Sequence, residues 1–436
     1  MPGPATDDHL EAQRIRGSAF RALHHRNFRL FFGGQLTSLI GTWMQTAAQS
    51  WLVLKLTNSP LMLGTVSFAN YLPILLITLF AGVFVDRADR RRLIILTQTL
   101  LMLSAFTLAA LTWTGLVRVQ YVIALAAFNG IVSSFDMPGR QAFVVKMVGV
   151  EDLSNAIAIN SLMFNSARMI GPAIAGLMIA GLGTSMCFFL NGVSYLAVIW
   201  SLYAMDLPRE SVPLSDRDIF RRLREGLSYV RRHRPTRDLL LISAVNNGLG
   251  SQYTVLVSLF ARNLLHGGPG LYGLLLTAQG VGAAAGAVTL ARAAGSTRAM
   301  VRNLTVGLFC SSVAIIGFGI SPWIVLSIAS QVLAGYGLTS TRATTNTLLQ
   351  MFVADELRGR VMSFYTLSAI GFAPIGALEV GFVGEHLGPR YAVVISGIIS
   401  VACAIVLLMR ARTIRSAHPE GGKIDAISES DLPASS

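Results

Sequence analysis

Residues 82–91 read Gly-Val-Phe-Val-Asp-Arg-Ala-Asp-Arg-Arg and form a short, strongly charged segment between two long apolar ones. The stretches 56–85 and 93–117 on either side contain no Asp, Glu, Lys or Arg. Each is longer than the roughly 20 apolar residues that a helix needs to cross a bilayer. This arrangement predicts a tight loop between two transmembrane helices.

The composition of the whole chain agrees with that local pattern. Hydrophobic residues make up 53% of the 436 residues, and charged residues only 13%, about half of the ~25% that is usual for a soluble domain. The mean hydropathy is +0.58. So few charges cannot cover the surface of a soluble protein of this size, and we expect an all-α integral membrane protein.

Other charge-free stretches extend the pattern to twelve predicted transmembrane helices, at 30–54, 61–85, 93–114, 119–140, 155–180, 185–205, 238–262, 270–291, 301–320, 323–346, 361–383 and 391–410. The basic segment 207–237 divides them into two bundles of six, 30–206 and 238–411. A weak repeat relates the halves, because Pro60-Leu-Met-Leu-Gly64 is similar to Gly270-Leu-Tyr-Gly273. Secondary transporters often have this plan, although chance similarity between apolar segments also produces such matches.

The basic residues indicate the orientation in the membrane. With the N-terminus in the cytoplasm, 29 Lys and Arg lie on the inner side and four on the outer side, as the positive-inside rule requires. We therefore expect a multi-pass protein of the cytoplasmic (inner) membrane with two cytoplasmic tails, 1–29 and a disordered 412–436. The net charge of +13 then faces anionic lipid, and nucleic acid is not an expected partner.

The sequence offers no nucleotide or metal site. None of the three lysines stands in a Gly-x-x-x-x-Gly-Lys-Ser/Thr loop, and the cysteines Cys187, Cys310 and Cys403 lie singly in apolar runs. The histidines are scattered, and no nucleophile arrangement is present. We expect neither an enzyme nor a cofactor, and we expect a monomer.

The charged segment resembles the loop motif of the major facilitator superfamily, Gly-x-x-x-Asp-Arg-x-Gly-Arg-Arg, which lies after the second helix. The matching residues are Gly82, Asp86, Arg87, Arg90 and Arg91. Asp89 stands where the superfamily usually has Gly. The resemblance implies that Asp86 and Arg90 form a gating clamp between bundle helices. An ordinary positive-inside loop is the alternative.

The predicted fifth helix carries Gly171-Pro172 and Gly176, which resemble the Gly-Pro motif of exporters in that superfamily. Proline removes a backbone donor and loosens a helix, and glycine permits close packing. Asp136-Met-Pro-Gly-Arg140 and Asp355-Glu-Leu-Arg-Gly-Arg360 are similar to the bacterial branch that includes the enterobactin exporter and multidrug efflux pumps. For the Gly-Pro motif, the alternative is a helix kink that says nothing about the direction of transport.

Polar residues spaced by three and four place stripes on several predicted helices. Because polar groups that face lipid are costly, such stripes should face the bundle interior, and in the superfamily helices 1, 4, 7 and 10 line the central cavity. The predicted substrate-cavity residues are Gln45, Gln49, Asn129, Asn165, Arg168, Asn247, Arg342 and Asn346. For the amides, contact between helices is the alternative role, and for Arg168 it is a structural contact with helix-end carbonyls.

Two carboxylates within the span are candidates for proton coupling, Glu379 and Asp136. Asp136 is four residues from Arg140 and can instead pair with it, and Glu379 can instead be a water-exposed rim residue. The sequence predicts a secondary active transporter that exports small organic molecules, siderophore-like or drug-like, by proton antiport. The alternatives are an importer of the same fold and a non-transporting membrane receptor or assembly factor.

Overall fold

The computed structural model describes residues 21–149, 152–206, 219–293, 296–353 and 355–416, and in these every regular element is a helix. The first half of the described chain contains the short helix η1 (Arg21–His24) and six long helices, α2 (Arg26–Thr57), α3 (Pro60–Arg87), α4 (Arg90–Trp113), α5 (Val119–Val148), α6 (Leu153–Gly181) and α7 (Thr184–Ala204).

The second half begins with α8 (Ile219–Arg232) and α9 (Arg234–Val245). Four short elements follow, η2 (Asn246–Gly250), η3 (Gln252–Leu256), α10 (Val257–Leu259) and η4 (Phe260–Leu264). The remaining helices are α11 (Pro269–Ala293), α12 (Thr297–Ile320), α13 (Ile324–Phe352), α14 (Asp355–Ile370), α15 (Ala373–His386) and α16 (Pro389–Ser416).

Within the described residues, ten helical segments are long and apolar enough to cross a membrane. They come from α3 to α7, from α11 to α13, from α14 with α15, and from α16. Large apolar side chains on these helices are exposed, among them Leu177, Trp200 and Phe309. Such a surface suits lipid rather than water, and the molecule is an all-helical membrane protein.

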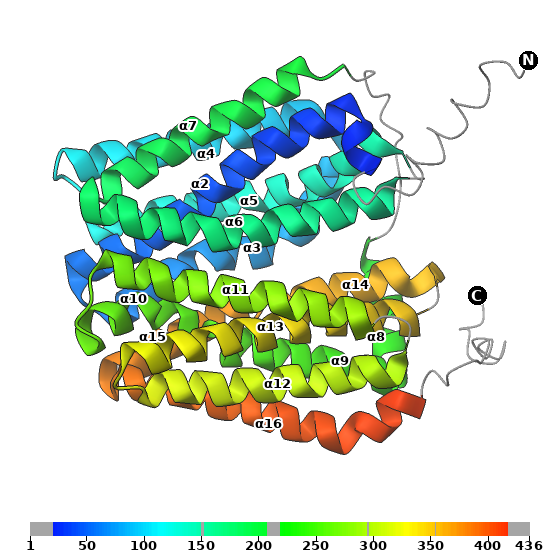
Figure 1. The fold of residues 1–436 in the computed structure, drawn as a ribbon. Coiled ribbons are helices and arrows are strands. Elements are labelled where there is room, and N and C mark those ends of the chain that lie inside the picture. The colour runs from blue at the N-terminus through cyan, green and yellow to red at the C-terminus, as the bar shows by residue number, and fades with distance from the viewer. Residues whose placement is uncertain (1–20, 150–151, 207–218, 294–295, 354, 417–436) are drawn as a thin grey trace, which may run out of the picture.

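The long helices form two groups that lie side by side (Figure 1). Helices α2 to α7 pack against one another in the N-terminal group, and α9 to α16 do so in the C-terminal group. The main contacts between the groups are those of α6 with α11 and of α3 with α15. The start of α2 and the end of α16 lie at the same end of the molecule (Figure 1).

The hydrophobic core is shared between the groups at one end only. One buried cluster combines residues of both groups, for example Trp51 and Leu54 with Tyr253 and Phe260. A second cluster lies in the C-terminal group around Leu304, and a third lies in the N-terminal group around Phe31. Toward the end that holds Arg21, each group therefore has its own core.

Close helix contacts join the groups at the shared core, which we call the closed end. A Cβ added to Gly64 of α3 would lie 2.4 Å from the carbonyl oxygen of Ala377 in α15. Ser59 Oγ donates to Glu385 Oε2 at 2.7 Å, and Asn263 Nδ2 donates to Asn58 Oδ1 at 3.0 Å. Small residues let the backbones approach, as is common between membrane helices.

Two predicted helices are divided into shorter pieces. The predicted helix 238–262 starts at Arg234 and then passes through a π-helical turn, η2, and a 3₁₀ turn, η3. Its sequence there is Asn246-Asn-Gly-Leu-Gly250, in which the asparagines and glycines are poor helix formers. The predicted helix 361–383 breaks at Gly371-Phe372, just before Pro374 in the first turn of α15, because proline cannot donate the hydrogen bond that would continue α14.

The described chain is also helical further into both predicted tails. η1 and the start of α2 fall within 1–29, and α16 extends through 412–416, part of the segment expected to be disordered. Residues 1–20 and 417–436 lie outside the described residues, and so do residues 207–218 of the predicted linker 207–237. The rest of that linker forms α8 and the start of α9.

Candidate functional site

A cavity of about 230 Å³, here called the central cavity, lies between the two groups. Helices α2, α3 and α6 line it from one side, and η3, α11 and α13 line it from the other. Its walls combine aromatic side chains, amides and two arginines, chiefly Trp43, Tyr71, Arg168, Gln252, Tyr272 and Arg342. The cavity therefore offers apolar surface together with charged hydrogen-bond donors.

The two arginines of the central cavity are held by neutral partners. Arg168 Nη2 donates to Thr339 Oγ1 at 3.1 Å, and Arg342 Nε donates to Asn247 Oδ1 at 2.6 Å. Among the described residues, neither arginine forms an ion pair with a carboxylate. Two like charges that are not neutralised by the protein attract an anionic ligand.

A second cavity, also of about 230 Å³, is called the enclosed cavity because all its lining residues belong to one group, the N-terminal one. Helices α2, α3, α4, α5 and α7 line it. Gln45, Gln49 and Asn129 are among its lining residues. Gln45 is already engaged, because Asn191 Nδ2 donates to its Oε1 at 2.7 Å.

Asp136 lines the enclosed cavity, and both oxygens of its carboxylate have partners within the protein. Its side chain is 1% exposed. Thr97 Oγ1 and Gln98 Nε2 donate to its Oδ1 at 2.8 and 2.9 Å, and Arg140 Nη2 lies 2.7 Å from its Oδ2. These contacts engage both carboxylate oxygens and match the alternative in which Asp136 pairs with Arg140.

Glu379 of α15 has different surroundings. It is half-buried, and its Oε2 is buried without a hydrogen-bond partner among the described residues. A carboxylate that lacks donors in a poorly solvated position is costly in its charged form. Of the two candidate proton carriers, Glu379 is therefore the one with a carboxylate oxygen that no donor among the described residues contacts.

Asn165, Asn247 and Asn346 line neither cavity. Asn165 Nδ2 donates to the carbonyl oxygen of Ser161 one turn earlier, and Asn346 Oδ1 accepts a bond from Gln350. Asn247 reaches the central cavity only through Arg342. The polar stripe expected on 238–262, namely Ser243, Asn247, Gly250 and Thr254, assumed a regular α-helix. In the structure, Thr254 lines the central cavity, and the π-helical and 3₁₀ turns bring Ser251 and Gln252 there with it.

The loop motif is only partly visible. Gly82, Asp86 and Arg87 belong to α3, but the side chains of Asp86 and Arg87 are not among the described ones. Asp89, the departure from the family pattern, caps α4, since its side chain accepts a hydrogen bond from the backbone nitrogen of Arg92 at 3.2 Å. Arg90 is the first residue of α4, and Arg91 Nη2 donates to the carbonyl oxygen of Tyr203 in α7.

The Gly-Pro motif lies where α6 packs against α2 of its own group and against α11 of the other group. A Cβ on Gly171 would lie 2.6 Å from Trp43 Cβ of α2, and one on Gly176 would lie 3.0 Å from Gly273 Cα of α11. Pro172 lines the central cavity, and α6 continues as one helix through it. The motif therefore permits close packing beside the cavity.

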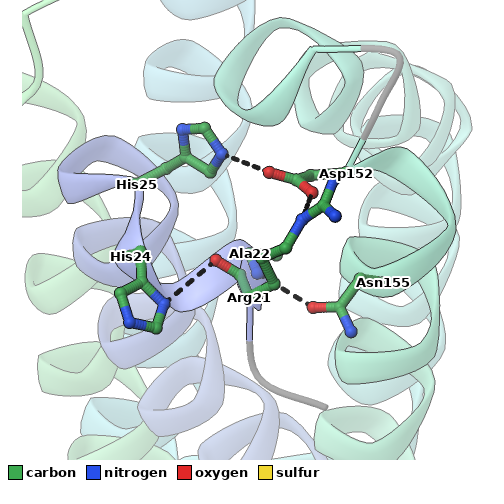
Figure 2. Close-up of polar contacts among 6 residues, drawn as sticks. All are labelled: Arg21, Ala22, His24, His25, Asp152 and Asn155. Atoms are coloured by element: carbon green, nitrogen blue, oxygen red, sulfur yellow. Dashed lines mark hydrogen bonds and ion pairs between the residues drawn. The ribbon is translucent and has the colours of Figure 1, made fainter. Parts of the chain in front are cut away.

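A polar cluster that the sequence analysis did not predict lies at the start of α6 (Figure 2). His25 Nε2 lies 2.7 Å from Asp152 Oδ2, and Arg21 Nε also donates to the Asp152 carboxylate. Asn155 Oδ1 accepts from the backbone nitrogen of Ala22, and His24 Nδ1 lies 3.3 Å from the carbonyl oxygen of Arg21. The hydrogen bond from His25, assisted by Arg21, lowers the pKa of Asp152. Residues more than 120 apart in the chain form this cluster, and no local spacing predicts such a contact.

Comparison with known proteins identifies the family. The model of the MFS_3 family, described as transmembrane secretion effector, matches residues 17–435. The chain is 24% identical to the staphyloferrin A transporter of Staphylococcus aureus, over 89% of this chain and 97% of the relative. It is also 24% identical to the enterobactin exporter EntS of Shigella flexneri, over 91% of this chain and 95% of the relative.

Among solved structures, the fold is similar to that of a bacterial homologue of the human lysosomal transporter Spinster. The TM-score is 0.70 at 13% identity, with 93% of this chain and 100% of that chain covered. The resemblance read from residues 82–91 is therefore confirmed, as is the expectation of a transporter rather than an enzyme. The chain belongs to the major facilitator superfamily of transporters, in the family of transmembrane secretion effectors.

Proposed function

We propose that this protein exports small organic molecules, siderophore-like or drug-like, across the cytoplasmic membrane by proton antiport. The observation that carries the proposal is the pair of arginines in the central cavity, Arg168 and Arg342, which have no carboxylate partner among the described residues. An anionic substrate group would complete their coordination. The efflux direction is supported by the family description and by the similarity to the enterobactin exporter.

The distribution of the core suggests how access alternates. The groups share a hydrophobic core at the closed end and have separate cores at the other end. Rocking of one group against the other would open the closed end while the groups meet at the opposite one. With cytoplasmic termini, this structure would be the state in which the central cavity faces the cytoplasm. By the family resemblance, Asp86 and Arg90 would clamp one of these states.

The membrane topology completes the proposal. We infer twelve crossings, because α2 and the broken run Arg234–Leu264 each extend across the same depth as their neighbours (Figure 1). Both termini and residues 207–236 would then be cytoplasmic, as the 29-to-4 distribution of basic residues indicates. A cysteine at Ser215 should react with membrane-impermeant thiol reagents only in inverted vesicles. Labelling from the periplasmic side of intact cells would contradict this orientation.

Energy would come from protons, at roughly 2.3 kcal/mol per 100 mV for each charge moved across the membrane. Glu379 is the preferred carrier, because its Oε2 lacks a donor while Asp136 is fully coordinated. Glu379→Gln should abolish uptake that depends on a pH gradient and retain substrate exchange across the membrane. Gradient-driven uptake by this variant at the wild-type rate would exclude Glu379 as the carrier.

The deciding experiment is transport into inverted vesicles with an acidic interior. We expect accumulation of the organic anion 6-hydroxy-2-naphthoate, collapse of that accumulation by a protonophore, and little accumulation of the cationic dye ethidium. An importer of the same fold would deplete the vesicles instead, and a receptor would bind without transport. Arg168→Ala should lower this accumulation. Its control is Arg118→Ala, which removes an exposed arginine just before α5.

A further inference from the structure

The central cavity and the enclosed cavity adjoin each other. Four residues line both of them, Thr46 and Ser50 of α2 and Ser67 and Tyr71 of α3. Each cavity is about 230 Å³, which is less than the roughly 300–1,000 Å³ of pockets that hold drug-sized ligands. A ligand of that size would therefore have to occupy both.

The two cavities differ in charge. The central cavity holds Arg168 and Arg342 without a neutralising carboxylate among the described residues. In the enclosed cavity, Arg140 Nη2 lies 2.7 Å from Asp136 Oδ2, so the two charges neutralise each other. The remaining polar groups of its lining are hydroxyls and amides, so this cavity suits uncharged polar groups.

Two amides of the enclosed cavity are available to a ligand. In the described part of the chain, the side chains of Gln49 and Asn129 make no hydrogen bond, and Asn129 Oδ1 is buried without a partner. Gln45, by contrast, is bound to Asn191. A side-chain amide both donates and accepts, and an unpaired one next to a cavity gains from a hydroxyl or amide ligand group.

We propose that the enclosed cavity is a second binding compartment, which takes the uncharged, hydroxyl- or amide-bearing part of a substrate whose anionic group binds Arg168 and Arg342. The aromatic side chains of Trp43, Tyr71 and Tyr272 at the central cavity suit a planar apolar body between the two ends. The substrate class is thus an organic anion with a distal uncharged hydrogen-bonding group. This inference rests on the proposed transport of organic anions and specifies their second recognition element.

The test uses three fluorescent probes that share one ring system. 6-Hydroxy-2-naphthoate carries both groups, 2-naphthoate lacks the hydroxyl, and 6-methoxy-2-naphthoate fills its space without a donor. We titrate the full-length protein in lipid nanodiscs with each probe. The hydroxylated probe should bind about fivefold more tightly than either analogue, the effect of one net hydrogen bond.

Variants then assign the preference to the amides. Gln49→Met and Asn129→Leu each remove an amide at nearly constant size. In at least one of these variants, the ratio of the Kd of 2-naphthoate to that of 6-hydroxy-2-naphthoate should fall close to one, while the Kd of 2-naphthoate itself is unchanged. Gln120→Met, the same substitution at an exposed position of α5, should keep the preference. A wild-type ratio near one, a ratio unaffected by both cavity variants, or no binding of any probe would overturn the proposal.

The experiments distinguish failure of the second binding compartment from failure of the proposed anion export. If vesicles accumulate all three naphthoates alike and Arg342→Gln lowers the uptake of each, anion export stands and the second compartment fails. If the protein shows the hydroxyl preference but no gradient-driven transport, the compartment stands as a binding site and the exporter proposal fails.

Discussion

At the residue scale, the main feature is a pair of arginines whose partners are neutral. Thr339 and Asn247 orient the guanidinium groups of Arg168 and Arg342 without cancelling their charge. A carboxylate at either position would hold the arginine but would also remove its attraction for an anion. The neutral partners therefore orient both side chains and leave their charge available for the anionic substrate that we propose.

Arg168 provides the first prediction. Arg168→Ala should weaken binding of 2-naphthoate about 10- to 100-fold, since a hydrogen bond to a charged group contributes about 1.5–3 kcal/mol. Arg168→Lys keeps the charge but loses the planar set of donors, so it should retain intermediate affinity. Fluorescence titration at matched membrane abundance measures both. Equal affinity in wild type and Arg168→Ala would show that this side chain does not bind the anion.

Asp152 provides a second prediction, on stability. Its pKa is lowered in the folded protein, chiefly by the hydrogen bond from His25 and further by Arg21. The stabilisation is therefore complete above the unfolded pKa of 3.8 and is lost as the pH falls through the lower folded value. Asp152→Asn should lower the Tm at pH 7, and the difference from wild type should shrink below about pH 4. A Tm difference that does not depend on pH would contradict the assignment.

At the scale of single elements, two broken helices face each other across the C-terminal group. The π-helical turn η2 contains Gly248, and the break before α15 is followed by Gly376. A Cβ on Gly376 would come within 1.6 Å of the carbonyl oxygen of Gly248. The irregular backbone of one element therefore fits only because the other has no side chain there.

This contact gives a matched pair of glycine substitutions. Gly376→Ala should destabilise the detergent-solubilised protein by about 1–3 kcal/mol or more, because the backbones must separate. Gly359→Ala, also within a helix but with nothing within 4 Å of the added carbon, should be neutral or stabilising by up to about 1 kcal/mol. Thermal unfolding of the two variants compares them directly. Equal Tm values would show that the backbones separate at little cost.

At the scale of the whole molecule, the proposed rocking of the two groups requires the contacts at the closed end to break. The contact of Ser59 with Glu385 joins α3 to the end of α15, beside the close approach of Gly64 and Gly381. These contacts join different groups, whereas the contact of Asn303 with Thr344 joins two helices of one group. A covalent link should therefore act differently at the two places.

Cross-linking tests this difference in a protein whose three cysteines have been replaced by serine. A short bis-methanethiosulfonate reagent that joins cysteines at Ser59 and Glu385 should abolish transport, and a reducing agent should restore it. The same reagent on cysteines at Asn303 and Thr344 should leave most transport intact. Full activity of the first cross-linked protein would rule out separation of α3 from α15 as part of the cycle.

The sequence by itself determined the class of the molecule. The charged segment at 82–91 and the long apolar stretches around it predicted a helical membrane protein of the major facilitator superfamily. The sequence also proposed Gln45, Gln49, Asn129, Arg168 and Arg342 as substrate-cavity residues. The first three line the enclosed cavity and the two arginines line the central cavity, and their contact with a substrate stays a prediction. These residues lie on regular helices, where spacings of three and four define a face, and polar groups on such a face avoid lipid.

Only the tertiary structure decided which polar residues meet. Asn165 and Asn346 have cavity-like spacing but bond within their own helices, and Gln252 reaches the cavity because π-helical and 3₁₀ turns change the helical period before it. The polar interior is divided into two adjoining cavities. In one, Arg140 neutralises the charge of Asp136, and in the other, Arg342 binds the neutral side chain of Asn247 and keeps its charge. Helical periodicity fixes the direction of a side chain relative to its own axis, whereas its partner depends on how that axis packs against others.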